Sequence, residues 1–494
     1  MKRDDINIAD ALAKPQKTSA IAWLNRWHKK LAWMAGIAVI FWGLTGVLHP
    51  IMSALSPKPQ PLPPALSLPT DLQPISPRQL PLAAEHVQSL RLRMWGDMPA
   101  WRVGVVDQAV GQWFDARNGQ LIANADSIEA ERLARALVGD AHSPIRKISA
   151  ITQFSASYPS INKILPVWQV EFARDDGMIA FVDTEGQRLA TLSDQTKRNL
   201  MPIFAALHTW NWANEPVKKV GITLVLTVAM LSVLGGLAMY WLRYRRQTLK
   251  ATQPALRRFH RGLGLLAGVA GLLITFSGLT HLWLQRAPFT AAQPEALALL
   301  PNLASIPAGA KSLVAVKVDS TGYWLLEQSK KEIQGNTGHQ HHHSAQVNQP
   351  LPSYLNEEGL VQSGIAERHA LHLLHRLAPN EASVQQASVK SLRIIQQFGG
   401  EYGFFQKRLP VYRVDLAGDA NASWYIEPAT GAFSTRVEDQ DRFEGYLFAN
   451  LHKWHWLDGL GKTTRDVILA SFAALNVILA VCGLWLLRRK KRSL

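Results

Sequence analysis

Four long apolar runs constrain the fold of this chain more than any other feature. They cover residues 31–48, 220–242, 262–284 and 467–487, and none of them contains Asp, Glu, Lys or Arg. A helix of about 20 apolar residues is long enough to cross the hydrocarbon core of a bilayer. The sequence therefore predicts four transmembrane helices, at residues 31–49, 220–242, 262–284 and 467–487.

The basic residues predict how these helices are oriented. Lys and Arg gather in residues 1–30, 243–261 and 488–494, where 19 of them face only three acidic residues, while the rest of the chain is balanced. Short cytoplasmic segments collect Lys and Arg, whereas translocated segments do not. We therefore expect a cytoplasmic leader, loop and tail at these three places, and large outer segments at residues 50–215 and 285–465. This topology accounts for the net charge of +16, so nucleic-acid binding is not expected.

The chain is an internal duplication. Residues 26–49 and 258–281, offset by 232, share eight identities, among them His28/His260 and His49/His281. Residues 204–212 and 448–456 share the pattern FAxLHxWxW, and each copy precedes a transmembrane run. The order of helix, outer segment, LHxWxW and helix thus occurs twice.

The outer segments predict two small α+β domains. Residues 166–172 and 178–182 alternate as strands and turn at 183–186, and residues 410–415 repeat the first of these strands at an offset of 244. Residues 127–138 predict a helix, and the periodicity of residues 77–92 predicts another. The fold class expected is an internally duplicated bundle of four transmembrane helices with two outer α+β domains.

Histidines at both ends of the duplicated spans predict a cofactor. A b-type haem in a helical bundle takes two axial imidazoles from different helices at the same depth. Six histidines satisfy this, which predicts two or three bis-histidine haems b: His28, His49, His208, His260, His281 and His452. His28 would pair with His260 near the cytoplasm. The outer four can pair within repeats (His49 with His208, His281 with His452) or across them (His49 with His281, His208 with His452).

Other side chains have weaker interpretations. The cluster His339, His341, His342 and His343 could bind Zn, Cu or Ni, or bind metals adventitiously. His369, His372 and His375 either share a ligand face or lie on a solvated helix face. Tryptophans in the LHxWxW segments, at positions 210, 212, 454 and 456, predict an interfacial aromatic belt. Glycines at positions 36, 43, 46, 264, 268, 271 and 278 either allow close helix packing or leave room for a porphyrin.

Several classes of chemistry are excluded. Cys482 is the only cysteine, which excludes disulfides, iron–sulfur clusters and covalent c-type haem. The sequence contains no GxGxxG, GxxxxGK[ST] or HExxH pattern. Electrons would therefore come from a quinol or a separate reductase.

The chain resembles the PepSY-associated transmembrane helix family of iron-regulated inner-membrane proteins. The resemblance rests on RWH and RFH at Arg26 and Arg258, GLTGVLHP at residues 43–50, the paired PVWQV and PVYRV strands, and both LHxWxW segments. It implies PepSY-type periplasmic domains, haem b at the six histidines, and reduction of a ferric siderophore for iron acquisition in a bacterial inner membrane. The alternatives are a non-catalytic periplasmic protein that binds or regulates peptidases, and a metal-uptake accessory that uses the His-rich loop.

Overall fold

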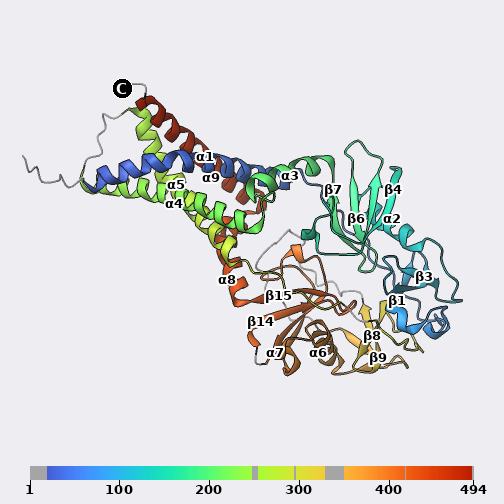
Figure 1. Cartoon of the computed structure of the whole chain (residues 1–494). Helices are drawn as coiled ribbons and strands as arrows, with labels where there is room; N and C mark the ends of the chain where they lie inside the picture. Colours follow the sequence, from blue (N-terminus) through green and yellow to red (C-terminus); the bar gives the residue numbers. More distant parts are fainter. Residues whose placement is uncertain (1–18, 248–253, 294–295, 329–349, 418, 492–494) are drawn as a thin grey trace, which may run out of the picture. The chain divides into compact units, whose positions relative to one another are not determined.

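The computed structural model describes residues 19–247, 254–293, 296–328, 350–417 and 419–491 (Figure 1). The chain divides into two compact units. One comprises Met1–Ala54, Met201–Gln285 and Glu444–Leu494, and the other Leu55–Leu200 and Arg286–Phe443. Each unit therefore takes segments from both halves of the duplicated sequence.

The first unit is a bundle of four long helices, α1 (Ala20–Leu55), α4 (Glu215–Arg245), α5 (Ala255–Leu284) and α9 (Lys462–Lys491), which lie alongside one another in Figure 1. All four are long and apolar enough to cross a membrane, so the four predicted spans are confirmed as helices of that kind. Large apolar side chains such as Ile37, Phe41 and Leu44 are exposed on α1. An apolar outer surface of this extent fits a lipid environment.

Small residues allow the helices to approach closely. A Cβ added at Gly43 would lie 2.6 Å from a methyl of Val477 on α9, and one at Gly36 would lie 3.0 Å from Leu484. On its other side, α1 packs Ala35 against Val228 and Ala229 of α4. These α1 glycines serve helix packing, which is their usual role in membrane bundles.

Shorter helices carry the two LHxWxW segments. In the first half, α3 (Gln195–His208) ends in this motif. In the second half, α8 (Asp439–Leu447) continues into the π-helix η6 (Phe448–His452), which is followed by η7 (His455–Leu460). Trp210 and Trp454 both adopt positive φ, of 51° and 52°, so the backbone turns at the same place in both motifs.

The second unit contains three antiparallel sheets. Two have four strands, in the orders β4-β5-β6-β7 and β12-β13-β14-β15, and the third has seven strands, in the order β11-β10-β9-β8-β1-β2-β3. The strands are β1 (Val87–Trp95), β2 (Met98–Val105), β3 (Gln112–Asp115), β4 (Ile145–Ile151), β5 (Val167–Phe172), β6 (Ile179–Asp183), β7 (Arg188–Ser193), β8 (Ala310–Val318), β9 (Thr321–Gln328), β10 (Ser353–Leu355), β11 (Val361–Gln362), β12 (Val389–Ile395), β13 (Val411–Leu416), β14 (Asp419–Ile426) and β15 (Phe433–Glu438).

The two four-stranded sheets repeat each other in register. Ile148 pairs with Val170 in one sheet and Leu392 with Val414 in the other, at the expected offset of 244. The first strand of each sheet also has an irregularity at the same place, between residues 145 and 147 and between residues 389 and 391. The duplication predicted from sequence therefore extends to individual strand pairs.

One helix covers each four-stranded sheet. The helix α2 (Ala125–Val138) packs Leu133 and Leu137 against β5 and β6. Its counterpart α6 (Ile365–Leu377) packs Ala370 and Leu374 into a core shared with β12 to β14. The remaining short helices are α7 (Ala382–Gln385), η2 (Pro77–Gln79), η3 (Ala84–His86), η4 (Ser160–Asn162) and η5 (Phe404–Gln406).

The helix predicted at residues 77–92 is wrong. Residues 87–95 form β1, which pairs with β2 on one side and with β8 on the other. Leu90 and Leu92 are fully buried there. Pairing with β8, which comes from the second half of the chain, overrides the local helical periodicity and joins strands from both outer segments in one sheet.

Candidate functional site

The two histidines near the start of the duplicated spans occupy equivalent positions on α1 and α5. His28 Nδ1 lies 2.8 Å from the carbonyl oxygen of Ser232 on α4. His260 packs on Gly483 of α9, where an added Cβ would lie 3.1 Å from Cε1 of the ring. His28 and His260 interact electrostatically, and no direct ring contact between them is observed among the described residues.

The other four predicted histidines form a second group, which we call the four-histidine group: His49, His208, His281 and His452. Phe204 stacks on His208 at 4.7 Å between ring centroids and also contacts His49 at 5.5 Å. In the second half, Phe448 stacks on both His452 (4.6 Å) and His281 (4.4 Å). Each repeat therefore places one phenylalanine between its two histidines.

The two halves of the four-histidine group meet at His208 and His452. Their ring centroids are 6.4 Å apart and the ring planes are nearly perpendicular, at 86°. A metal–imidazole bond is about 2.0–2.1 Å, so two imidazoles on opposite sides of one ion have centroids on the order of 6 Å apart. The observed contact joins the repeats, whereas the shared phenylalanines join the histidines within each repeat.

Hydrogen bonds fix the tautomer of three of these rings. The acceptors of His28 and His281 are the Ser232 carbonyl and the Glu444 carboxylate, which lies 2.5 Å from His281 Nδ1. His208 Nδ1 lies 2.9 Å from the Thr45 hydroxyl, whose own hydrogen is directed to backbone carbonyls of α1. Nδ1 is therefore the donor in all three rings, which leaves the lone pair of Nε2 available to a metal.

The other rings are held differently. His260 Nδ1 and His452 Nδ1 are buried and form no hydrogen bond of normal geometry within the described part of the chain. His49 has no hydrogen bond to any described residue and is held by its contact with Phe204. The backbone groups of Leu479 and Ile274 interact weakly with His260 and His452, respectively.

Glycines lie directly beside three of the histidines. An added Cβ at Gly236 would be 3.4 Å from His28, and one at Gly278 would be 3.8 Å from His452. With Gly483 beside His260, three of the six rings have a neighbour without a side chain. Of the seven glycines singled out in the sequence, only Gly278 touches a histidine, while Gly236 and Gly483 were missed.

The LHxWxW tryptophans divide into two kinds. Trp210 stacks on Trp42 at 5.9 Å, and Trp454 is buried against Phe472. Trp212 and Trp456 are exposed, as an interfacial belt requires. The neighbouring His455 contacts Asp458 and Arg465, at 2.8 and 2.7 Å, which places it in an ion-pair network.

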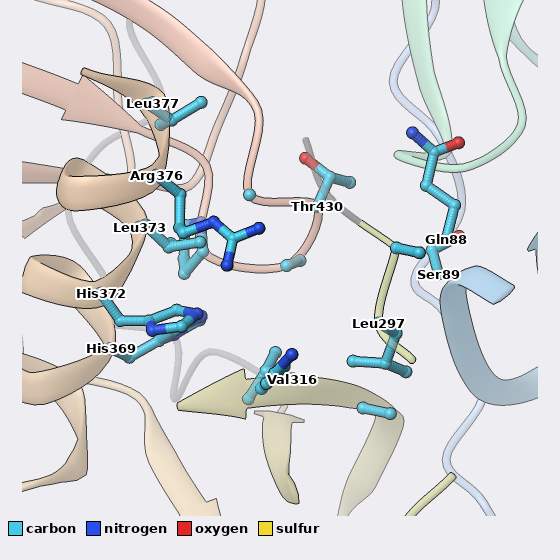
Figure 2. Close-up of a pocket in the computed structure, with 16 residues that line it drawn as sticks. Gln88, Ser89, Leu297, Val316, His369, His372, Leu373, Arg376, Leu377 and Thr430 are labelled. Atoms are coloured by element: carbon cyan, nitrogen blue, oxygen red, sulfur yellow. The ribbon is translucent and has the colours of Figure 1, made fainter. Parts of the chain in front are cut away.

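The second unit contains the histidines of α6. His369 is buried and its Nδ1 lies 2.8 Å from the hydroxyl of Tyr354. Burial lowers the pKa of His369 to about 3. Figure 2 shows His369 and His372 side by side at a pocket, with Arg376 from the same helix and with Gln88 and Thr430 on the opposite wall. The solvated face considered from sequence is therefore wrong for His369.

Closed metal sites are not found in the described parts of the chain: no group of three or more His, Cys, Asp or Glu side chains there could hold a metal ion. The cluster His339, His341, His342 and His343 lies outside the described residues. Within the four-histidine group, His208 and His452 are in ring contact, and the described histidines do not form a closed protein cage.

Comparison with known proteins adds no assignment: no protein-family model, curated protein or solved structure matches this chain. The six histidines were predicted from the sequence, whereas their neighbours Phe204, Phe448, Thr45 and Glu444 were not. The signal for the phenylalanines was present, since each precedes a motif histidine by four residues in both repeats.

Proposed function

We propose that this protein is a haem-containing oxidoreductase of the PepSY-associated transmembrane helix type, located in a bacterial inner membrane. It would pass electrons across the bilayer to a ferric siderophore or a similar chelate in the periplasm. The proposal rests mainly on the tautomer shared by His28, His208 and His281. In each ring Nδ1 donates a hydrogen bond to a protein acceptor, and Nε2 keeps its lone pair for a metal.

The residues present fit bis-histidine haem b. Paired imidazoles from different helices are the donor set that such a haem needs. Glycines beside three of the rings leave space for such a group. His28 and His260 would hold one haem, and the four-histidine group one or two more. The haem supplies a one-electron redox couple.

The protein side chains would orient the ligands and shield them from water. Ser232, Thr45 and Glu444 fix ring orientation through Nδ1 and increase the donor strength of Nε2. Phe204 and Phe448 cover the faces of the imidazoles in the four-histidine group. These contacts allow the ligands to stay fixed during electron transfer, so little reorganisation is needed.

The charge distribution supports the orientation. Basic residues in the segments 1–30, 243–261 and 488–494 support a topology with both termini in the cytoplasm and the sheet-containing unit in the periplasm. An electron from a quinol or a separate reductase would reduce chelated Fe(III) to Fe(II). Release follows because the hard oxygen donors of a siderophore hold Fe(II) more weakly than Fe(III).

Anaerobic mixing tests this function. Full-length protein in detergent is reduced with dithionite, freed of excess reductant, and mixed with a ferric chelate and a ferrous-specific dye. We expect one Fe(II) for each haem equivalent reoxidised. The variant His208→Ala should react more slowly, whereas His142→Ala, which changes an exposed histidine of the other unit, should match the parent protein. Rapid haem reoxidation without Fe(II) would contradict the proposal.

A further inference from the structure

Two equivalent loops of the sheet-containing unit meet each other. The short helix η4 (Ser160–Asn162) ends at Lys163, and η5 (Phe404–Gln406) ends at Lys407, at the repeat offset of 244. The two helices are in contact, and Lys163 Nζ lies 2.5 Å from Gln406 Oε1. The duplication has therefore brought two copies of one loop to a common surface.

Both lysines adopt a backbone conformation that lysine disfavours. The φ angles are 60° at Lys163 and 68° at Lys407, in the left-handed region where glycine or asparagine is more favourable. Left-handed non-glycine residues concentrate at binding and catalytic sites. The duplication has therefore kept a lysine in this conformation in both repeats.

The lysines lie beside aromatic rings and a third lysine. Lys163 Nζ is 5.0 Å from the centroid of Phe405, and Lys407 Nζ is 5.7 Å from that of Phe404. Lys197 of α3 bonds to Thr191 Oγ1 and the Leu192 carbonyl, at 2.9 and 2.6 Å. The Asp194 carboxylate interacts electrostatically with Lys197, whereas burial is the cause that lowers the pKa of Lys163 and of Lys407.

These cations are also poorly solvated. Burial lowers the pKa of Lys407, and burial together with the charge of Lys407 lowers that of Lys197. Lys197 and Lys407 are half-buried, while Lys163 is exposed. The three lysines outnumber the one carboxylate, Asp194, that acts on them, so the surface is positive, which favours binding of an anion.

The surface between the lysines is apolar and exposed. Phe404 is 64% exposed, Phe405 is 46% exposed, and Ile161 at the tip of the other loop is 66% exposed. Exposed aromatic rings in a concentrated patch mark an interaction site more often than isolated ones do. A ligand that is complementary to both the lysine charges and the exposed aromatic rings carries negative charge on a flat aromatic framework.

We propose that this surface, formed by Ile161, Lys163, Lys197, Phe404, Phe405 and Lys407, binds an anionic aromatic iron(III) chelate of the tris-catecholate class. This deepens the proposed function, on which it rests, by naming the class of chelate. A tris-catecholate iron complex is anionic because its six phenolate oxygens outweigh the charge of the ion, whereas a tris-hydroxamate complex is neutral. Catechol rings would pack on the phenylalanines while the phenolate oxygens face the ammonium groups.

A membrane surface is the competing occupant of such a patch. Lysines that contact lipid headgroups extend into solvent, whereas Lys197 and Lys407 are half-buried and Lys163 is directed to Gln406. The observations therefore favour a compact ligand. Anionic lipid vesicles serve as the comparison in the test.

The test uses full-length protein in detergent and a redox-inert gallium(III) tris-catecholate complex, with binding measured by calorimetry. The double variant Lys163→Asn/Lys407→Asn removes two charges and keeps a residue type that tolerates positive φ. We expect its affinity to fall at least tenfold. Lys147→Asn, which changes an exposed lysine of β4, should bind like the parent, and the gallium tris-hydroxamate complex should bind at least tenfold more weakly to the parent.

Equal binding of both gallium complexes, or unchanged binding by the double variant, would overturn the inference. The inference would also be overturned if the double variant no longer bound anionic vesicles but still bound the gallium chelate. Haem absorbance is recorded on the same samples. Red protein that does not bind the chelate contradicts this inference alone, whereas colourless protein that binds it contradicts the reductase and leaves the chelate site in place.

Discussion

The two repeats share their scaffold and differ in their buried polar groups. In the first repeat the motif histidine His208 is anchored by Thr45, while His49 lacks a hydrogen bond to any described residue. In the second repeat the anchored ring is His281, bound to Glu444, and His452 Nδ1 is unpartnered. Leu200 and Ser277 stand at the positions equivalent to Glu444 and Thr45. The duplicated histidines have thus stayed at equivalent positions, while the polar and charged residues around them have diverged between the repeats.

The outer halves differ in the same way. The helix α2 buries Asp126, which binds Arg102 and the indole nitrogens of Trp113 and Trp168. The helix α6 instead buries His369 against Tyr354. Backbone register is the same in both four-stranded sheets, so the difference lies in the covering helices and their side chains. We conclude that a fold-level repeat does not predict equivalent sites.

The largest expected effect comes from removing the motif histidines. His208→Ala and His452→Ala should each lower the haem content by one per chain, measured by pyridine haemochrome. If the two rings share one haem, the double variant loses no more than either single variant. If each pairs within its own repeat, the double variant loses two. A full haem content in both single variants would contradict ligation by these residues.

Asp126→Ala should destabilise the sheet-containing unit by about 3–5 kcal/mol, because the buried Arg102 keeps only Glu185 as an ion-pair partner and the indole N–H groups of Trp113 and Trp168 lose their acceptor. His369→Ala should cost less, about 1–3 kcal/mol, since it leaves an uncharged Tyr354 hydroxyl without one hydrogen bond. Urea unfolding followed by near-ultraviolet circular dichroism measures both. Equal costs would mean that the buried charge in the first half has no special role.

As the pH falls, the stabilising contribution of His369 in the second half should be lost before that of Asp126 in the first half. Burial keeps the pKa of His369 at about 3, below the value near 6.5 in an unfolded chain. The unfolded state therefore binds the proton first, and stability is lost by roughly 1.4 kcal/mol per pH unit as the pH falls below about 6.5. His369→Gln should remove this slope. A slope that persists in the variant would show that another group is responsible.

Asp126 titrates in a lower range. Burial alone would raise its pKa, but Arg102 and the hydrogen bonds from Trp113 and Trp168 outweigh burial and lower it. Its contribution is present above the unfolded pKa, near 3.9, and is lost only as the pH falls through the lower folded value. The two halves should therefore lose stability in separate pH ranges.

The smallest expected effects concern the partners of Nδ1. Thr45→Val removes the acceptor of His208, and Glu444→Gln keeps an acceptor for His281 but removes its charge. Such changes around a metal ligand typically cost about 10-fold or more in affinity or activity. We expect both variants to retain haem and to reduce ferric chelate about 10-fold more slowly, and Glu444→Gln alone to raise a midpoint potential. Identical potentials in the two variants would contradict the proposed difference between the repeats.

Much of the fold could be predicted because its signals are local. Apolar runs gave the four helices, and repeated motifs gave the duplication and the six histidines. The seven-stranded sheet could not be predicted, since β1 pairs with β8 across more than 200 residues. Glu444, Gly236 and Gly483 were missed for a similar reason: each acquires its role only when another helix brings a histidine beside it.

The absorption spectrum of the purified full-length protein tests the central claim most directly. We predict red protein with a Soret band that shifts on reduction by dithionite, and a pyridine haemochrome count of two or three haems b per chain. Protein expressed with adequate haem supply that is correctly folded but colourless would contradict the account.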